Sequence, residues 1–373
     1  MKENSKKWPA VILALVFILA LYYFLVEPST LNQAQQLETV KAKVTEVLDI
    51  SENKEIADQT QGGITSTQVS FKAKVGKEEV LAYQQVANLI PNEKLAEKGD
   101  WVVLVNIESQ GQKNWVMASY HRIGYVTIVA VALALILIIL GLKKGLNSLI
   151  ALVLTVAMIF FVFIPMIIQG ASIYFWTLVT AFYSIFITIY LITGWSDKSL
   201  VTILGCVFGT LVAAGLSYGL GSFLHLTGGY DDATLALHRM ASTMPIDLRA
   251  LIFAGITIGA LGAVMDVAMD ISSSLYEIRL HAKVGFKELY KSGISIGRDL
   301  MGTMTNTLVL AYIGGSISSV LIRVVSSSSM LILFNTELII VDLLQALLGS
   351  IALVLTMPLT AFFAAALYSK EDL

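Results

Sequence analysis

Long apolar runs separated by short polar stretches dominate the chain. The first run extends from Trp8 to Val26, and seven more follow Arg122, at 123–141, 146–168, 172–193, 200–225, 249–270, 301–322 and 339–367. A helix that crosses the hydrocarbon core of a bilayer needs about 20 apolar residues. The pattern therefore predicts an α-helical polytopic membrane protein with about eight transmembrane helices. No small-residue cleavage site follows the first run, so we interpret it as a retained anchor helix.

Residues 27–122 follow a different pattern, because apolar and polar residues alternate there. The alternating sets are Val40, Ala42 and Val44, then Val69, Phe71, Ala73 and Val75, then Trp101, Val103 and Val105. A period of two is typical of half-buried strands, and Gly62-Gly63, Gly76-Lys77 and Gly99-Asp100 supply turns. The segment is predicted to form a small β-rich domain, an OB-like or SH3-like barrel inserted after the first helix.

Three regions follow from these patterns: a tail and anchor helix (1–26), the β-rich domain (27–122) and a seven-helix transmembrane domain (123–373). If the helices alternate in direction, most cations of the short loops fall on one side. These are Lys2, Lys6, Lys7, Lys143, Lys144, Lys198, Arg279, Lys283, Lys287, Lys291, Arg298 and Lys370, against Arg239, Arg249 and Arg323 opposite. Because cytoplasmic loops carry the excess of Lys and Arg, we expect a multi-pass protein of the cell membrane with both termini cytoplasmic and residues 27–122 extracellular.

Composition supports the bilayer as the main solvent of the chain. The 373 residues are 56% hydrophobic and 14% charged, with a mean hydropathy of +0.75, whereas soluble domains are about 25% charged. The single cysteine, Cys206, excludes an internal disulfide framework. The β-rich domain has no aromatic and basic stripe, so we expect no nucleic-acid partner.

The chain lacks the common signatures of enzymes. It contains neither a phosphate-cradling Walker A sequence nor a GxSxG nucleophile motif. Asp266 and Asp270 lie on one predicted helix, about 6 Å apart along its axis, which disfavours an aspartyl protease whose carboxylates must share a proton. We therefore expect a protein that is not an enzyme, and the sequence indicates no particular cofactor.

An acidic stripe is the strongest candidate for function. Asp266, Asp270, Ser273 and Glu277 recur at spacings of four, three and four, and small residues extend the same face upstream, at Gly255, Gly259, Gly262 and Ala263. Carboxylates inside a membrane helix are costly, so they face protein or water. One alternative is that the helix simply leaves the hydrocarbon near Asp266. Asn306 is the polar side chain that we expect opposite Asp266 or Asp270.

A second candidate is the outer loop between the runs at 200–225 and 249–270. Asp231, Asp232 and His238 can together bind a divalent cation, although their spacing matches no metal signature strongly. The alternative interpretation is a loop in which these residues cap a short helix and form salt bridges.

Two blocks carry a resemblance to a known family. The Arg122–Leu149 segment, with its apolar run and "KKGLNSL", and the Gly259–Ser274 segment, "GALGAVMDVAMDISSS", resemble the YibE/F-like family of bacterial membrane proteins. The resemblance extends from about residue 38 to residue 367. It implies a multi-spanning membrane protein, with a similar membrane protein as companion in some members, and it implies no catalytic residues.

Two functions fit these features. The first is a transport or translocation component, in which Asp266, Asp270, Glu277 and Asn306 line a path for a cation, a proton or a small polar solute. The second is a non-catalytic assembly or sensor subunit whose β-rich domain binds an extracellular partner. The expected partners are the lipid bilayer and either a paralogous membrane companion or further copies of the chain.

Overall fold

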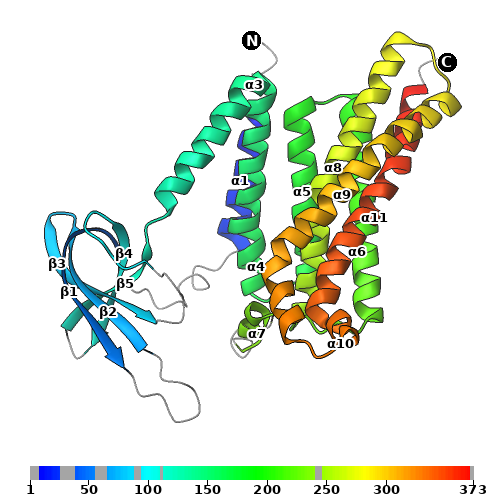
Figure 1. Cartoon of the computed structure of the whole chain (residues 1–373). Coiled ribbons are helices and arrows are strands. Elements are labelled where there is room, and N and C mark those ends of the chain that lie inside the picture. The colour runs from blue at the N-terminus through cyan, green and yellow to red at the C-terminus, as the bar shows by residue number, and fades with distance from the viewer. Residues whose placement is uncertain are drawn as a thin grey trace. The chain divides into compact units, whose positions relative to one another are not determined.

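The structure is a computed structural model that describes residues 8–25, 38–54, 65–87, 94–109, 112–239 and 246–369. Contacts divide the chain into two compact units, Asn32–Ile136 and the combination of Met1–Leu31 with Leu137–Leu373. Figure 1 shows a strand-rich and a helix-rich part. The predicted turn at Gly62-Gly63 and the terminal cations Lys2, Lys6, Lys7 and Lys370 lie outside the described residues.

The strands form a closed barrel, as predicted (Figure 1). Its five strands are β1 (Thr39–Lys54), β2 (Thr65–Val75), β3 (Glu78–Ala87), β4 (Trp101–Ser109) and β5 (Gln112–Tyr120). They close in the order β1-β2-β3-β5-β4, with β3 and β5 parallel and the other pairs antiparallel. This five-stranded closure is the architecture of the OB-like alternative.

The alternation identified the core face of two strands and missed that of a third. Ala42 and Val44 of β1 and Val69, Phe71 and Ala73 of β2 are buried, as their phase predicts. In β4 the opposite phase is buried: Val102 and Leu104 face the core, while Trp101 is 44% exposed. Both phases of β4 are apolar, so pairing with β1 and β5, and not the pattern, selects the inward face. Lys41 lies over the outward Trp101 ring, 4.4 Å from its centroid.

Six segments of the described chain are long and apolar enough to cross a membrane, so the expected count of about eight helices is not confirmed. They are Ile123–Ile168, Ile173–Thr193 (α5), Asp197–Phe223 (α6), Leu248–His281 (α8), Phe286–Ser326 (α9) and Glu337–Tyr368 (α11). The first segment comprises α3 (Ile123–Met158), a π-helical turn (Ile159–Phe163) and α4 (Ile164–Ile168). The anchor helix α1 (Trp8–Leu25) is a shorter apolar helix.

The long first segment is interrupted at Leu142, which has a left-handed φ of 47°. Positions 137 and 145 would be about 12 Å apart along an unbroken helix. Instead, a Cβ atom added to Gly145 would collide with the carbonyl oxygen of Leu137. The helix therefore turns back sharply between these two residues, and Gly145 permits the close approach.

Helices α8 and α9 extend well beyond the predicted apolar runs. The predicted runs end at residue 270 and start again at residue 301, whereas α8 continues to His281 and α9 begins at Phe286. Leu275 and Leu289 of these extensions are buried, so packing on α11 keeps the polar sequence helical. The stretch 323–340, which joins the predicted runs at 301–322 and 339–367, contains the end of α9, a short helix α10 (Met330–Asn335) and the start of α11.

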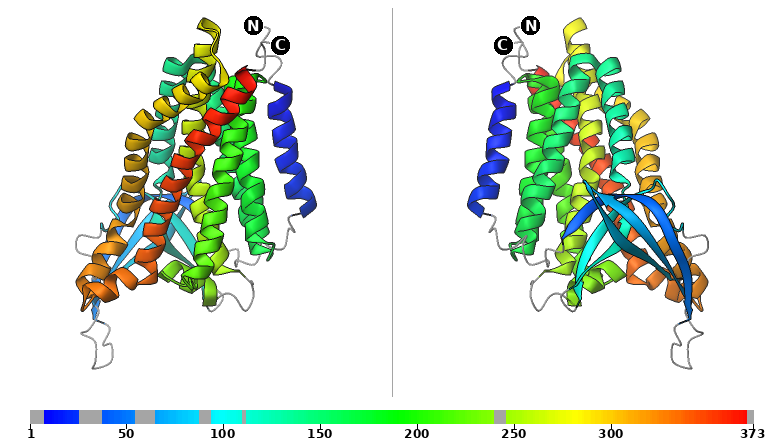
Figure 2. Two further views of the ribbon diagram at one scale, coloured as in Figure 1. Left: turned by 90° about the vertical axis from the view of Figure 1, so that its right-hand side faces the viewer. Right: turned by 90° about the vertical axis from the view of Figure 1, so that its left-hand side faces the viewer.

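Helix α11 packs against α6, α8 and α9 (Figures 1 and 2). Close approach depends on glycines of α6, as its small-residue spacing predicts. A Cβ atom at Gly205 or Gly209 would overlap the hydroxyls of Thr360 and Thr356 on α11, and each glycine also meets α8. Gly215, Gly219 and Gly221 of the same helix have open space instead.

Candidate functional site: a polar stripe on helix α8

Helix α8 begins at a well-defined cap. The Asp247 carboxylate accepts hydrogen bonds from the backbone N–H groups of Arg249 and Ala250, at 3.0 and 3.2 Å. From there, one face of α8 packs on α5, α6, α9 and α11. The opposite stripe is exposed and contains Gly255, Gly259, Gly262, Asp266, Asp270 and Glu277. The acidic and small residues therefore share one face, which we name the α8 stripe.

Contacts with α6 define how deep the carboxylates lie. The Ser272 hydroxyl donates to the backbone carbonyl of Lys198, in the first turn of α6, at 3.0 Å. With a rise of 1.5 Å per residue, Asp270 lies about 3 Å and Asp266 about 9 Å deeper in the helix bundle than Ser272. Glu277 lies about 7.5 Å beyond Ser272 in the opposite direction. Asp266 is thus level with the interior of α6, whereas Glu277 is beyond its end.

The two aspartates are close enough for their charges to interact. In the described part of the chain neither forms an ion pair or a hydrogen bond, whereas Glu277 lies 3.9 Å from the ring of His281. The described residues also contain no group of three potential metal ligands among His, Cys, Asp and Glu. The stripe consequently presents two closely spaced carboxylates without a cation from the described chain.

Asn306 lies on α9 at about the depth of Asp266. Tyr312 meets Gly259 and Gly293 meets Leu275, so α8 and α9 run antiparallel and residue 304 falls level with Asp266. Asn306 is exposed. It forms no hydrogen bond with either aspartate among the described residues, so its expected role stays a prediction.

Sequence reasoning missed three polar side chains near the outer part of the stripe. The Tyr312 hydroxyl fills the space that a side chain at Gly259 would occupy, and it is buried without a hydrogen-bond partner among the described residues. Gln345 of α11 approaches Gly255, with its amide nitrogen 3.3 Å from the position of an added Cβ. Asp342 lies one turn earlier on α11. The i, i+3 pair of Asp342 and Gln345 within an apolar run was the available signal.

A helix cap and hydrogen bonds to the Glu337 carboxylate hold the outer loop in place. The Asp231 carboxylate accepts hydrogen bonds from the backbone N–H and the hydroxyl of Thr234, and so caps α7 (Asp232–Arg239). Glu337, at the start of α11, accepts hydrogen bonds from Thr227 N–H, Thr227 Oγ1 and Gly228 N–H, each at 2.7 Å. The side chain of His238 lies outside the described residues, so the suggested metal site with Asp231 and Asp232 stays a prediction.

Tyr230 joins this loop to the outer ends of α10 and α11. It packs against Leu333, Leu338 and Ile339. Burial raises the pKa of its phenol above the usual value, and the nearby carboxylates of Asp231, Asp342 and Glu337 raise it further. The outer loop thus anchors the outer helix ends.

Comparison with known proteins gives one match. The family model described as YibE/F-like protein matches residues 129–370, which include all of the α8 stripe. No curated protein and no solved structure matches the chain.

Proposed function

The chain belongs to the YibE/F-like protein family, and from this premise we propose that it is a membrane transport or translocation component whose ion path follows the α8 stripe. The path conducts a proton, another cation or a small polar solute. Asp266 and Asp270 attract the cation, Glu277 lies at the mouth on the lysine-rich side, and Asn306 supplies a neutral polar contact. The mechanism needs no covalent step.

The observation that carries this proposal is the depth of exposed Asp266 and Asp270. An ionised carboxylate at the centre of a membrane helix costs about 2.5–3.5 kcal/mol on insertion scales, and such groups face water or a polar partner. The described chain provides no ion pair for either aspartate. A hydrated or cation-bearing surface therefore fits them better than direct contact with lipid chains.

The length of the polar surface supports the same role. From Gly255, beside Gln345, to Glu277 the stripe extends about 33 Å, which is close to the roughly 30 Å thickness of the hydrocarbon core. Gln345 supplies a further polar group beyond Asp266, where α8 itself offers only glycines. A permeating ion would thus meet polar groups along most of the crossing.

Ion flux into proteoliposomes tests the proposal directly. The full chain is reconstituted, and proton, Na⁺ and K⁺ entry is followed with trapped indicators. The double variant Asp266→Asn/Asp270→Asn keeps side-chain size and removes both charges, so flux should fall at least tenfold. The control Asp49→Asn removes an exposed charge from the barrel and should leave the flux unchanged. A wild-type chain that conducts none of these ions, or a folded double variant with wild-type flux, would contradict the proposal.

We further propose that Ile123–Ile168 crosses the membrane twice, with its reversal at Leu142. A single helix of these 46 residues would extend about 69 Å, more than twice the hydrocarbon thickness of about 30 Å. With α1 as a further crossing, the chain crosses eight times. Both termini and Lys143 then lie on the lysine-rich, cytoplasmic side of the cell membrane.

A further inference from the structure

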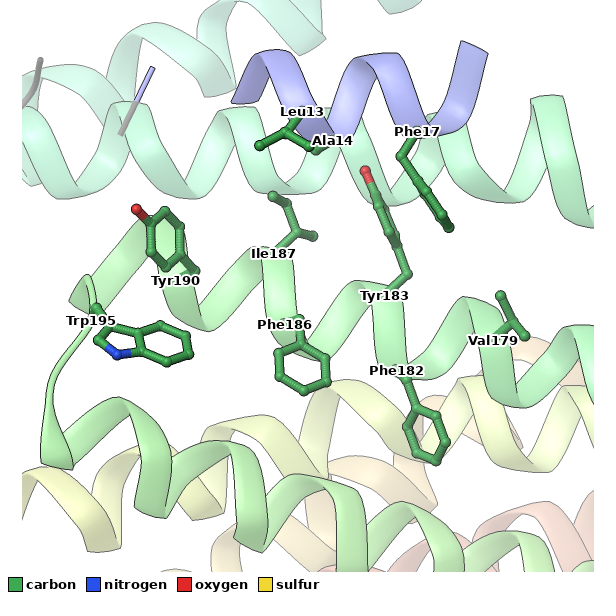
Figure 3. A pocket seen from close by; sticks show the side chains of 10 residues that line it. All are labelled: Leu13, Ala14, Phe17, Val179, Phe182, Tyr183, Phe186, Ile187, Tyr190 and Trp195. Carbon is green, nitrogen blue, oxygen red and sulfur yellow. The ribbon is translucent and has the colours of Figure 1, made fainter. Parts of the chain in front are cut away.

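An apolar groove lies between α1 and α5, on helices that do not contribute to the α8 stripe. Its volume is about 610 Å³. Figure 3 shows its ten lining side chains, with Tyr190 and Trp195 at one end and Val179 and Phe182 at the other. Apart from two phenols and one indole, these side chains are hydrocarbon.

The groove is long enough for one extended hydrocarbon chain. From Val179 to the end of α5 at Thr193 is about 21 Å of helix, and Trp195 lies two residues beyond. The length also exceeds one leaflet of hydrocarbon, which is about 15 Å thick.

One end of the groove has the character of a membrane interface. Trp195 is 80% exposed and directly precedes Ser196, the cap of α6, whose hydroxyl accepts from the Ser199 N–H. Tyr190 lies near Trp195, with ring centroids 6.3 Å apart. Tryptophan and tyrosine favour the depth of lipid headgroups, so this end should lie at the membrane surface.

Cations gather at the same end. The Asn147 side chain donates to the Leu191 carbonyl at 2.8 Å, which fixes the second half of α3 beside the last turn of α5. Lys144 lies one turn before Asn147. Its charge interacts with that of Lys198, three residues after Trp195. Two lysines from different helices thus lie near the interfacial end of the groove.

The surrounding carboxylates do not cancel these two charges. Asp197 pairs with Arg279 at 3.4 Å. Glu277 interacts with Lys198 and also lies 3.9 Å from His281. With the exposed Lys143, four cations of the described chain (Lys143, Lys144, Lys198 and Arg279) face two described carboxylates at this corner. The excess positive charge complements an anionic headgroup.

We propose that this groove is a binding site for an anionic phospholipid of the leaflet on the Lys144 side. One acyl chain lies between α1 and α5, and the phosphate lies between Lys144 and Lys198 beside Trp195. Charge complementarity at the end of a long apolar groove selects this occupant. The bound lipid would link α1 to the helix bundle.

Spin-labelled lipids test the site in the reconstituted full chain. Trace phosphatidylglycerol or phosphatidylcholine, labelled on the acyl chain, is added to phosphatidylcholine bilayers, and the motionally restricted fraction is measured. The wild-type chain should prefer phosphatidylglycerol. Lys144→Gln/Lys198→Gln should reduce that preference at least fivefold, because each lysine near the surface contributes about fivefold in anionic-lipid affinity. The control Lys287→Gln/Lys291→Gln removes two exposed charges from α9 and should retain the preference.

A second pair of variants tests the acyl-chain part of the site. Leu13→Trp fills the groove, whereas Ile12→Trp enlarges an exposed neighbour that does not line it. Only the first should reduce the restricted fraction of both lipids. Any one of three results would overturn the proposal. The wild-type chain could bind both lipids equally, the two lysine double variants could lose the preference for phosphatidylglycerol equally, or the two tryptophan variants could change the restricted fraction equally.

Discussion

At the scale of residues, single polar side chains in this protein join distant segments through hydrogen bonds. Glu337 shows this most clearly, since one carboxylate holds the 227–228 turn against the start of α11 with three hydrogen bonds. In the same turn, Gly228 has a φ of 85° and leaves no space for a side chain beside Leu248. One carboxylate and one glycine therefore set how three segments meet at the outer end.

Glu337→Ala should destabilise the protein by about 1–3 kcal/mol, because it leaves the hydrogen-bond donors of Thr227 and Gly228 without their acceptor. Glu337→Gln retains the oxygen that can accept from both N–H groups, so it should cost less than half as much. Thermal unfolding of the purified full chain in detergent, followed by fluorescence, measures both. Equal unfolding temperatures for the alanine variant and the wild-type chain would show that the hydrogen bonds of Glu337 do not stabilise the fold.

At the scale of elements, tertiary contacts determine where helices break and how far they extend. The reversal at Leu142 places a leucine in the left-handed region, at a cost of about 1–2 kcal/mol. That cost is offset by packing of the second half of α3, where Asn147 binds α5 and Leu154 and Met158 are buried. Tertiary contacts therefore hold a backbone geometry that the local sequence disfavours.

Gly145→Ala should destabilise this reversal, because the added Cβ would overlap the Leu137 carbonyl. Overpacking of this kind costs about 1–3 kcal/mol. Gly141→Ala is the matched control, since nothing lies within 4 Å of its added Cβ. Thermal unfolding in detergent should show a lower transition temperature for the first variant alone. A similar change in both variants would show that the close contact at Gly145 does not hold the reversal.

At the scale of the whole molecule, a membrane part and a barrel are joined in one chain, and the number of crossings decides on which side each lies. The apolar groove and the α8 stripe are separate features of the helical unit. Their proposed roles, lipid binding and ion conduction, meet at Glu277, which belongs to the stripe and interacts with Lys198 at the lysine-rich end of the groove. In the proposed double crossing of Ile123–Ile168, residues 119 and 172 lie on the same side of the membrane.

Single cysteines test that crossing in a Cys206→Ala background, since Cys206 is the only cysteine of the chain. Cysteines at Ser119 and Ser172, which flank the segment and are exposed, should react with an impermeant maleimide from the same side of intact cells. A cysteine at Lys143 should react only from the other side. Labelling of 119 and 172 from opposite sides would establish a single crossing and contradict the eight-crossing arrangement.

The sequence by itself determined the class of the protein. Burial in lipid and burial in a barrel core each impose a pattern of apolar residues that is recognisable within a short stretch of sequence. Apolar runs identified α5, α6, α8, α9 and α11, and alternation identified the barrel. The spacing of Asp266, Asp270 and Glu277 also predicted their common face, because 3.6 residues per turn is a local property of the helix.

Only the tertiary structure decided the features that depend on neighbours. Both phases of β4 are apolar, so strand pairing selected Val102 and Leu104 for the core. The polar ends of α8 and α9 remain helical because Leu275 and Leu289 pack on α11, and Tyr312 meets the α8 stripe from a distant helix. Such contacts join residues that are far apart in the chain, so the periodicity of a short stretch of sequence does not predict them.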